Sequence, residues 1–395
     1  MPAEFFVKGA EDMIIENGLV FTPSFEFEKM NIRITDDRIE KLSKTRIEPD
    51  VNEETVNAEG MFVIPGLTDV HFHGAVSYDF CDATPEAIHK IAVYERSVGV
   101  TQICPATMTL PEERVEKICK VAYDYNNGVG KIDDGLREAD LVGINLEGPY
   151  ISPNKVGAQN PAYVKGADRD YLKKLLEKTE YLPKLITIAP EEADNLDCIE
   201  KLHDKIRFSV GHTVADYKCA RAAFEAGARH MTHLYNAMPS LTHRAPGPIA
   251  AGSERDDVTA ELICDGIHIA PGAVRAAFKL FGADRMVLIS DSARAVGMPD
   301  GTYELGGQPV YKHDGAAWLN KEPGINGTLA GSTTNLFDCM LKAIEFDIKP
   351  EDAVRAATYN PAYAIGILKD YGTIEEGKKA NILLLNKDYS LNWVI

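Results

Sequence analysis

The sequence predicts an α/β fold, a (β/α)8 TIM-type barrel with a small β-sandwich domain formed by both chain termini. Three observations support this prediction. Short apolar segments alternate with amphipathic helical segments through the middle of the chain. Segments with strand signals, and no helix signal between them, lie at both ends. Residue types that bind metals follow nearly every predicted strand of the barrel, where such barrels carry their chemistry.

Both terminal segments have the character of β-strands. Near the N-terminus, Met13-Ile14-Ile15 precedes the turn dipeptide Asn17-Gly18, and residues 30–34 alternate between apolar and polar. The same pattern returns in residues 372–385. Each segment is too small to fold alone, so we expect them to form one domain together. This division gives a small β domain of residues 1–62 and 368–395, and a barrel of residues 63–367.

The eight predicted barrel strands are short apolar runs bounded by turn residues. They cover residues 61–64, 100–104, 141–146, 185–188, 206–210, 230–232, 259–264 and 286–289. The helices between them have clear start and stop signals, because Pro85, Pro111 and Pro271 stand at predicted first turns and Gly99 and Gly227 at predicted ends. The last segments are a Gly-rich hairpin insertion and two helices that close the barrel, predicted over residues 302–326, 332–345 and 350–366.

Charge and cysteine content exclude several classes of partner. The formal net charge of -18 disfavours nucleic acid and anionic membrane surfaces, which need a basic protein face. A small anionic substrate remains compatible with this charge, since a few local cations can hold one phosphate. The seven cysteines are odd in number and form no C-x-x-C pair, which indicates reduced thiols in a cytoplasmic protein. There is no signal peptide or transmembrane segment in the sequence pattern.

Candidate metal ligands follow the predicted strands in register. They are His71 and His73 after the first strand, Glu147 after the third, Glu191 after the fourth, His212 after the fifth, His233 after the sixth, Asp265 and His268 after the seventh, and Asp291 after the eighth. A single buried histidine is more often a hydrogen-bonded core residue, but a set on one rim of a barrel predicts a metal site. Imidazoles with a carboxylate favour Zn²⁺ or Fe²⁺, which activate a water molecule and polarise a carbonyl. Asp291 is placed to transfer the proton, although a helix N-cap would also suit it.

Several motifs resemble the amidohydrolase superfamily of metal-dependent hydrolases and, within it, the deacetylases of N-acetylated sugar phosphates. They are His71-Phe72-His73, Leu146-Glu147-Gly148-Pro149-Tyr150, Val210-Gly211-His212-Thr213, His233-Leu234-Tyr235-Asn236-Ala237-Met238, Asp265-Gly266-Ile267-His268 and Gly327-Thr328-Leu329-Ala330-Gly331-Ser332. The resemblance covers essentially the whole chain. It implies hydrolysis of the N-acetyl group of N-acetylglucosamine 6-phosphate to glucosamine 6-phosphate and acetate, in amino-sugar catabolism.

The resemblance also implies roles for individual residues. Glu147, His212 and His233 would bind the catalytic divalent metal, Zn²⁺ in the first place and Fe²⁺ as the alternative, and Asp291 would be the acid/base. His71 and His73 are both present, which leaves room for a second ion. The implied substrate-binding residues are Ala158, Asn236, Ala237, Arg244, His268, Leu329, Ala330 and Gly331. Within this set Asn236, Ala237 and Arg244 would hold the phosphate, and Arg244 would reach across the interface of a homodimer.

Two positions depart from the family pattern. Gln159 stands where a histidine is common, and a glutamine can donate a hydrogen bond to the acetyl oxygen but carries no charge. Ala245 stands where an acidic residue is common. Three alternatives remain: an N-acetylgalactosamine-6-phosphate deacetylase, another amidohydrolase acting on a cyclic amide, and a non-catalytic binding protein. The last is disfavoured because the acid/base carboxylate, Asp291, is present.

Overall fold

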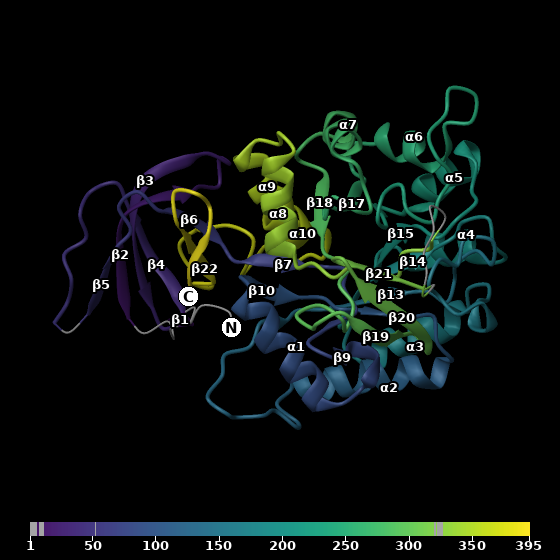
Figure 1. Cartoon of the computed structure of the whole chain (residues 1–395), viewed down its shortest axis with the longest axis horizontal. Coiled ribbons are helices and arrows are strands. Elements are labelled where there is room, and N and C mark those ends of the chain that lie inside the picture. Colours follow the sequence, from purple (N-terminus) through teal and green to yellow (C-terminus); the bar gives the residue numbers. More distant parts are fainter. Residues whose placement is uncertain (1–5, 8–11, 52, 320, 322–326) are drawn as a thin grey trace.

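Two bodies of structure lie side by side, a sheet made from the chain ends and a parallel barrel (Figure 1). The computed structural model describes residues 6–7, 12–51, 53–319, 321 and 327–395. The helices between the two bodies are α8 (Leu336–Glu345), α9 (Pro350–Ala357) and α10 (Tyr359–Ala364). The predicted fold class is therefore confirmed.

Both chain ends contribute to one eight-stranded sheet, in which the order is β1-β23-β22-β6-β2-β3-β4 and β5 pairs with β2. Its strands are β1 (Phe6–Val7), β2 (Met13–Phe21), β3 (Phe27–Thr35), β4 (Arg38–Ser43), β5 (Glu54–Asn57), β6 (Phe62–Pro65), β22 (Ile382–Leu385) and β23 (Leu391–Val394). Strand β22, from the C-terminal segment, lies inside the sheet between β23 and β6 and pairs antiparallel with β6. The two ends thus depend on each other for hydrogen bonding, as expected, while the exact limits of 1–62 and 368–395 stay a prediction.

The barrel strands pair in parallel throughout. They are β7 (Leu67–Asp69), β10 (Val100–Ile103), β11 (Ala106–Thr107), β12 (Asp140–Leu141), β13 (Ile144–Glu147), β14 (Pro183–Ile188), β15 (Arg207–Val210), β16 (His230–Met231), β17 (Thr259–Ile263) and β18 (Met286–Ile289). Between β10 and β11 lies Pro105, which has no backbone N–H to give to a ladder. Beyond the ends of β18 and β7, the Asp291 backbone N–H donates to the His71 carbonyl at 2.9 Å, which joins the first and last segments of the ring.

The first barrel strand was assigned wrongly from the sequence. Residues 61–64 overlap β6, which pairs with β2 and β22 in the terminal sheet. The barrel begins with the next strand, β7, one residue later. Between them lies Gly66, where an added Cβ would stand 1.8 Å from Thr101 Oγ1. The chain crosses from one sheet to the other at a place where only a glycine fits, so one apolar run is divided between two sheets.

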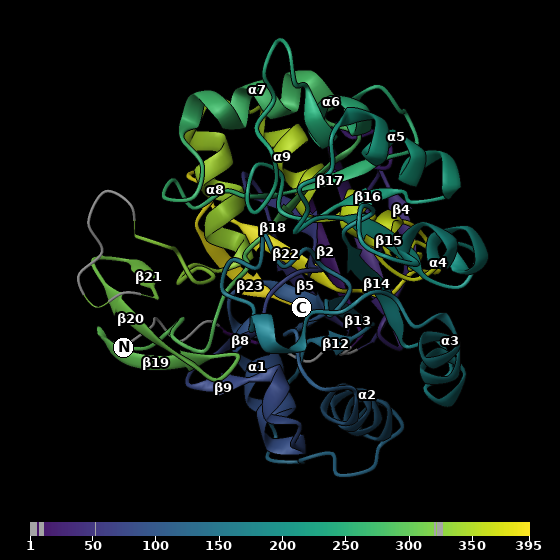
Figure 2. The same cartoon turned by 90° about the vertical axis from the view of Figure 1, so that its right-hand side faces the viewer.

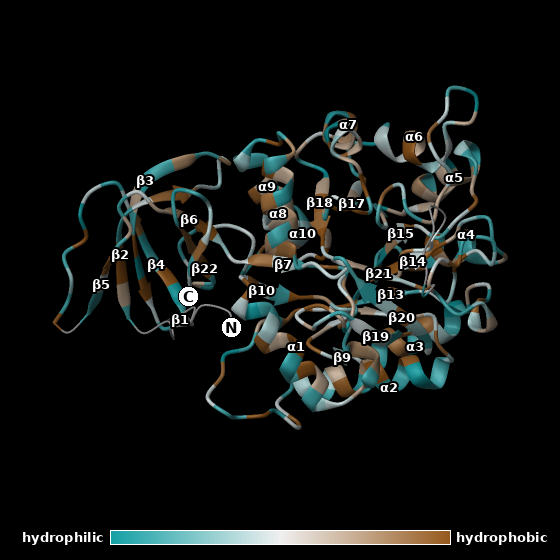
Figure 3. Cartoon of the chain, viewed as in Figure 1, coloured by the Kyte–Doolittle hydropathy of each residue, from teal (hydrophilic) through white to brown (hydrophobic). Residues whose placement is uncertain are grey.

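An outer ring of helices surrounds the strands (Figure 2), and brown apolar residues concentrate on the strands (Figure 3). The ring helices are α1 (Pro85–Ser97), α2 (Glu112–Asn126), α3 (Arg169–Lys178), α4 (Asn195–Leu202), α5 (Tyr217–Ala226), α6 (Gly247–Ser253) and α7 (Pro271–Phe281). The predicted starts at Pro85 and Pro271 and the predicted end at Gly227 are confirmed. The predicted helix over 350–366 is divided into α9 and α10, because Pro361 removes the N–H that a continuous helix needs.

The predicted insertion after β18 forms a three-stranded antiparallel sheet of β19 (Gly301–Leu305), β20 (Gln308–His313) and β21 (Ala316–Trp318). Residues 320 and 322–326 of that segment lie outside the described residues. The remaining short elements are β8 (Gly74–Ala75), β9 (Tyr78–Asp79), η1 (Phe80–Asp82) and η2 (Pro161–Tyr163). Over the described ranges of the chain, the helices are all too short or too polar to cross a bilayer.

Candidate metal centre

The ends of four parallel strands bring imidazoles and carboxylates to one point. Glu147 is the last residue of β13, and His212, His233 and Asp291 follow β15, β16 and β18. The last three have φ angles of 45°, 26° and 49°, a left-handed conformation that side-chain-bearing residues rarely adopt. Each such residue costs on the order of 1–3 kcal/mol, and these conformations concentrate where function requires them. The strain lies on the residues predicted to act.

Glu147, His212 and His233 form a compact donor cluster. Glu147 Oε1 lies 2.9 Å from His212 Nε2 and 3.2 Å from His233 Nε2, and the two Nε2 atoms are 3.0 Å apart. Ligand atoms that share a tetrahedral ion at about 2.1 Å stand roughly 3.4 Å apart. Two imidazole nitrogens cannot both offer lone pairs to each other, but they can offer them to one cation. The donor set therefore fits one divalent ion.

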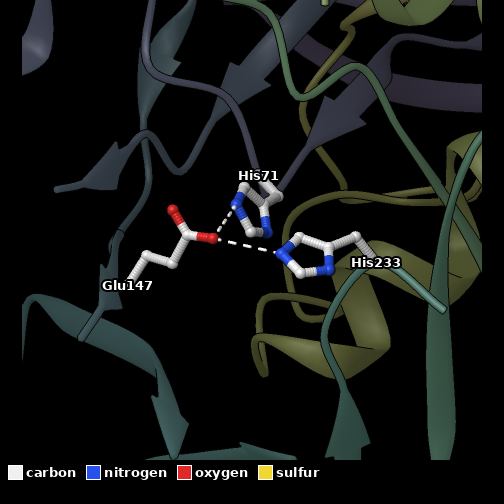
Figure 4. A group of neighbouring side chains, drawn as sticks. All are labelled: His71, Glu147 and His233. Atoms are coloured by element: carbon white, nitrogen blue, oxygen red, sulfur yellow. Dashed lines mark hydrogen bonds and ion pairs between the residues drawn. The ribbon is translucent and has the colours of Figure 1, made fainter. Parts of the chain in front are cut away.

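Both histidines of the H-x-H pair also face the Glu147 carboxylate. His71 Nε2 is 3.5 Å from Glu147 Oε1, and His71 and His233 point toward this oxygen together (Figure 4). His73 Nε2 lies 3.3 Å from Glu147 Oε2 and 3.3 Å from Asp291 Oδ1. The donor atoms of His71, His73 and Asp291 lie within 4.8 Å of one another, and so do those of His71, Glu147 and His233. His71 thus belongs to two overlapping groups that could each hold an ion.

Hydrogen bonds behind the cluster orient its donors. His212 Nδ1 donates to the Lys155 carbonyl at 2.7 Å, which leaves the Nε2 lone pair facing Glu147. Gln159 Nε2 donates to Glu147 Oε2 at 2.6 Å, and Gln159 Oε1 accepts from the Thr109 N–H at 2.6 Å. Burial alone would raise the pKa of Glu147, but the surrounding imidazoles hold this pKa well below its usual value. Glu147 is therefore a carboxylate at neutral pH, as a metal ligand must be.

A cavity of about 510 Å³ opens above the cluster, within the range of small-molecule sites. Six of the eight predicted substrate residues line it: Ala158, Asn236, Ala237, His268, Leu329 and Gly331. Asn236 Nδ2 is buried and has no hydrogen-bond partner among the described residues, so this donor is free for a ligand. The two predicted residues outside the lining are Ala330 and Arg244. Ala330 is buried and its N–H donates to Ala317, whereas Arg244 is exposed on the loop between β16 and α6.

The two remaining strand-end carboxylates, Asp265 and Glu191, form hydrogen bonds outside the metal cluster. Asp265 accepts from His268 Nδ1 at 2.7 Å and from the His268 backbone N–H at 2.8 Å. Burial alone would lower the pKa of His268, but this bonded Asp265 raises it above its usual value. Glu191 accepts from Thr213 Oγ1 and the Val214 N–H and lies outside the metal cluster. Both therefore order loops at the rim.

Two buried carboxylates that support the cluster were missed in the sequence. Asp69 Oδ1 accepts from the His71 N–H at 3.1 Å and Oδ2 from Ser290 Oγ at 2.5 Å, and burial raises the pKa of Asp69 to about 7. Glu261 is fully buried in β17 and contacts His71 and His233. The available signal was a charged residue inside a strand that otherwise reads as apolar, since such residues are rarely buried without a partner.

Comparisons with known proteins agree with this geometry. Residues 62–394 match the amidohydrolase family. The chain is 32% identical over 381 residues to the N-acetylglucosamine-6-phosphate deacetylase of Bacillus subtilis (strain 168), covering 96% of this chain and 94% of that one. It is 31% identical over 342 residues to the N-acetylgalactosamine-6-phosphate deacetylase of Escherichia coli O157:H7, covering 86% and 87%.

A solved structure has the same architecture along nearly its whole length. It is a mutant N-acetyl-D-glucosamine-6-phosphate deacetylase from Mycobacterium smegmatis in complex with N-acetyl-D-glucosamine-6-phosphate. The TM-score is 0.87 at 29% identity, and the alignment covers 98% of both chains. The similarity therefore includes the terminal sheet as well as the barrel.

Proposed function

This chain belongs to the amidohydrolase family, and we propose that it hydrolyses the N-acetyl group of N-acetylglucosamine 6-phosphate to glucosamine 6-phosphate and acetate. One observation carries the proposal: Glu147, His212 and His233 meet within 3.2 Å on the floor of a cavity that Asp291 also lines. The relatives from Bacillus subtilis and Mycobacterium smegmatis are named N-acetylglucosamine-6-phosphate deacetylases. The structure of the Mycobacterium smegmatis mutant is a complex with N-acetyl-D-glucosamine-6-phosphate.

The family implies a divalent metal site, and the donors named above fit one. We propose Zn²⁺ as the ion, with Fe²⁺ as the alternative, because imidazole and carboxylate donors suit both. Glu147, His212 and His233 would hold it. His71, His73 and Asp291 would supply the donors for a second ion. When bound, such an ion lowers the pKa of a water molecule and polarises the acetyl carbonyl.

Asp291 performs the proton transfers in this proposal. Its carboxylate takes a proton from the attacking water while the carbonyl carbon becomes tetrahedral. Asp291 then gives this proton to the amide nitrogen, the C–N bond breaks, and the amine leaves with acetate as the other product. His73, with Nε2 at 3.3 Å from Asp291 Oδ1, fixes the direction of the carboxylate. The left-handed backbone at Asp291 holds it at the cavity wall.

The sugar phosphate would be recognised by the cavity lining. His268, held by Asp265, lines the cavity and would contact the sugar. The unpartnered Nδ2 of Asn236 and the backbone of Ala237 would donate to the phosphate. Leu329 and Gly331 would form the wall beside the acetyl group, with the buried Ala330 between them in the chain. Arg244 is exposed and outside the lining of its own chain, which supports a homodimer in which it reaches the partner's phosphate.

The epimeric substrate, N-acetylgalactosamine 6-phosphate, is the second candidate, because the Escherichia coli relative is named for it. The two sugars differ at one hydroxyl. The test is acetate release from both N-acetylhexosamine 6-phosphates, with the metal content of the same protein measured by elemental analysis. A higher kcat/KM for the gluco compound supports our proposal, and a higher value for the galacto compound supports the alternative. Acetate release from neither compound by metal-loaded protein would overturn both.

We propose a cytoplasmic location. All seven cysteines are free in the structure and six of them are buried. Proteins of oxidising compartments use their cysteines in disulfides, whereas cytoplasmic proteins keep them reduced. A free-thiol count of seven in denatured protein purified without reductant would support this location, and an intramolecular disulfide would contradict it.

A further inference from the structure

Glu261 is a fully buried carboxylate in the middle of β17, with 0% exposure. Its Oε2 lies 2.8 Å from His71 Nδ1 and accepts from the His233 backbone N–H at 3.0 Å. Its Oε1 lies 3.0 Å from His230 Nε2. Burying an ionised carboxylate in a barrel interior has a large desolvation penalty, which an apolar residue of similar size would avoid. The three hydrogen bonds therefore indicate a task beyond stability.

These contacts determine which nitrogen of His71 carries the proton. An ionised carboxylate can only accept, so His71 Nδ1 must donate to it. The neutral imidazole then has its lone pair on Nε2. That atom is buried, has no hydrogen-bond partner among the described residues, and lies 3.5 Å from Glu147 Oε1 and 3.9 Å from Asp291 Oδ1. Glu261 thus presents the His71 lone pair to the metal cluster.

The second oxygen of Glu261, Oε1, contacts His230, a histidine outside the metal cluster. His230 Nε2 faces Glu261, and His230 Nδ1 lies 2.5 Å from Thr259 Oγ1. Since the hydroxyl of Thr259 can donate to Nδ1, His230 is satisfied as a neutral ring that donates from Nε2. Three donors surround the two oxygens of Glu261, namely His71 Nδ1–H, His230 Nε2–H and the His233 backbone N–H, and such donors favour the ionised carboxylate. The chain of hydrogen bonds keeps Glu261 ionised and fixed.

We propose that Glu261 is the positioning residue that makes His71 a metal ligand and fixes the turn carrying His233. The inference rests on the proposed metal site. His71 and His233 follow strands far apart in the sequence, β7 and β16, and Glu261 Oε2 accepts hydrogen bonds from both segments. Carboxylate partners of metal-bound histidines fix the ring and raise its basicity, and their loss typically costs about 10–100-fold in metal affinity.

The test compares Glu261→Leu with Glu261→Gln and with the control Thr259→Val. Affinity for Zn²⁺ is measured by competition with a chromophoric chelator, and bound ions per chain by elemental analysis. We expect Glu261→Leu to weaken Zn²⁺ binding about 10–100-fold, because His71 Nδ1 loses its acceptor. Glu261→Gln keeps an acceptor for His71 and can donate to His230, so its affinity should lie between that of Glu261→Leu and the wild type. Thr259→Val alters the same buried chain without touching His71 and should keep wild-type affinity.

A second measurement does not depend on the variants. In Zn²⁺-loaded wild-type protein labelled with ¹⁵N-histidine, the His71 ring should carry its proton on Nδ1, facing Glu261, and leave Nε2 unprotonated. Wild-type Zn²⁺ affinity in a folded Glu261→Leu, or a wild-type His71 protonated at Nε2 alone, would overturn the role of Glu261. Wild-type protein that binds no Zn²⁺ would instead overturn the proposed metal site.

Discussion

The side chain of Gln159 contacts the Glu147 oxygen that does not face His212 and His233. Its Nε2 donates to Glu147 Oε2 at 2.6 Å, while Glu147 Oε1 faces His212 and His233. The Gln159 oxygen accepts from the Thr109 N–H. One end of this amide is thus fixed by the backbone, and the other orients the carboxylate of Glu147, the proposed metal ligand. Its first role is to orient Glu147, which the sequence alone did not indicate.

Gln159→Leu should therefore weaken metal binding as well as turnover. Loss of a hydrogen bond behind a ligand typically costs about 10–100-fold in affinity or activity. Zn²⁺ affinity measured by chelator competition and kcat/KM for the sugar phosphate check this. The matched control is Gln308→Leu, since Gln308 Nε2 donates to the Ala158 carbonyl and touches no ligand, so Zn²⁺ affinity should stay at the wild-type value. Unchanged affinity in Gln159→Leu would contradict the orienting role.

Asp291→Asn should remove proton transfer and leave the Glu147 site loaded. The amide is the same size but cannot accept a proton at neutral pH, and general acid–base catalysis contributes about 10²–10⁴-fold. We expect kcat to fall by that factor, while elemental analysis still finds the ion held by Glu147, His212 and His233. Steady-state kinetics on metal-analysed protein measure both quantities. Wild-type kcat in this variant would remove Asp291 from the mechanism.

Arg244→Ala should raise KM for the phosphorylated sugar. A hydrogen bond to a charged group contributes about 1.5–3 kcal/mol, which corresponds to roughly a 10–150-fold loss in affinity. Hydrolysis of N-acetylglucosamine without the phosphate should be unaffected. Arg169→Ala is the control, because Arg169 is an exposed arginine on α3 that pairs with Asp197. Equal losses with the two substrates would show that Arg244 does not act on the phosphate.

Mixed dimers test whether Arg244 acts in the partner's site. A dimer of one Arg244→Ala chain and one Asp291→Asn chain contains a single site with an intact Asp291. That site regains activity only if it receives Arg244 from the other chain. We expect the mixture, co-expressed with two affinity tags and purified through both, to recover up to about half of the wild-type activity on dimerisation. Activity no higher than that of the two variants alone would place Arg244 in its own chain's site.

Removing the metal should abolish activity and lower thermal stability. A ligand that binds only the folded state stabilises it by RT ln(1 + [L]/Kd), about 2.7 kcal/mol at one hundred times Kd. Chelator-treated protein should therefore unfold at a lower temperature in calorimetry, and added Zn²⁺ or Fe²⁺ should restore both the unfolding temperature and acetate release. Full activity in protein that elemental analysis shows to be metal-free would contradict the proposal that hydrolysis depends on a metal ion.

Gly66→Ala should destabilise the junction between the two sheets. An added Cβ would stand 1.8 Å from Thr101 Oγ1 and 2.8 Å from Thr101 Cβ, and overpacking of this kind costs typically 1–3 kcal/mol. Chemical denaturation measures the loss. Gly272→Ala in α7 is the control, because an added Cβ there meets no atom within 4 Å of the described structure and alanine favours the helix. Equal free energies of unfolding for the two variants would contradict the steric clash expected between a Cβ at Gly66 and Thr101.

The predictions that held were those with local causes. Pro85 begins α1, where the structure shows Thr84 capping the helix by accepting from the Ala87 N–H, and Gly227 ends α5 with a φ of 122°. A capping hydroxyl and a glycine act within one turn of their own position, so the sequence displays them directly. The register of His212, His233 and Asp291 behind apolar strands is local in the same way, and it was sufficient to predict a shared rim.

The sequence by itself determined the strand-and-helix alternation, the helix starts at Pro85 and Pro271, and the register of the histidine and carboxylate side chains behind the strands, because each depends on neighbours in the chain. The tertiary structure alone decided three matters: the assignment of residues 61–64 to the terminal sheet, the bond from Gln159 to Glu147, and the contact between Glu261 and His71 across 190 positions. Such pairs form only when the barrel closes. Until then nothing near either residue in the chain distinguishes its partner from any other buried polar group.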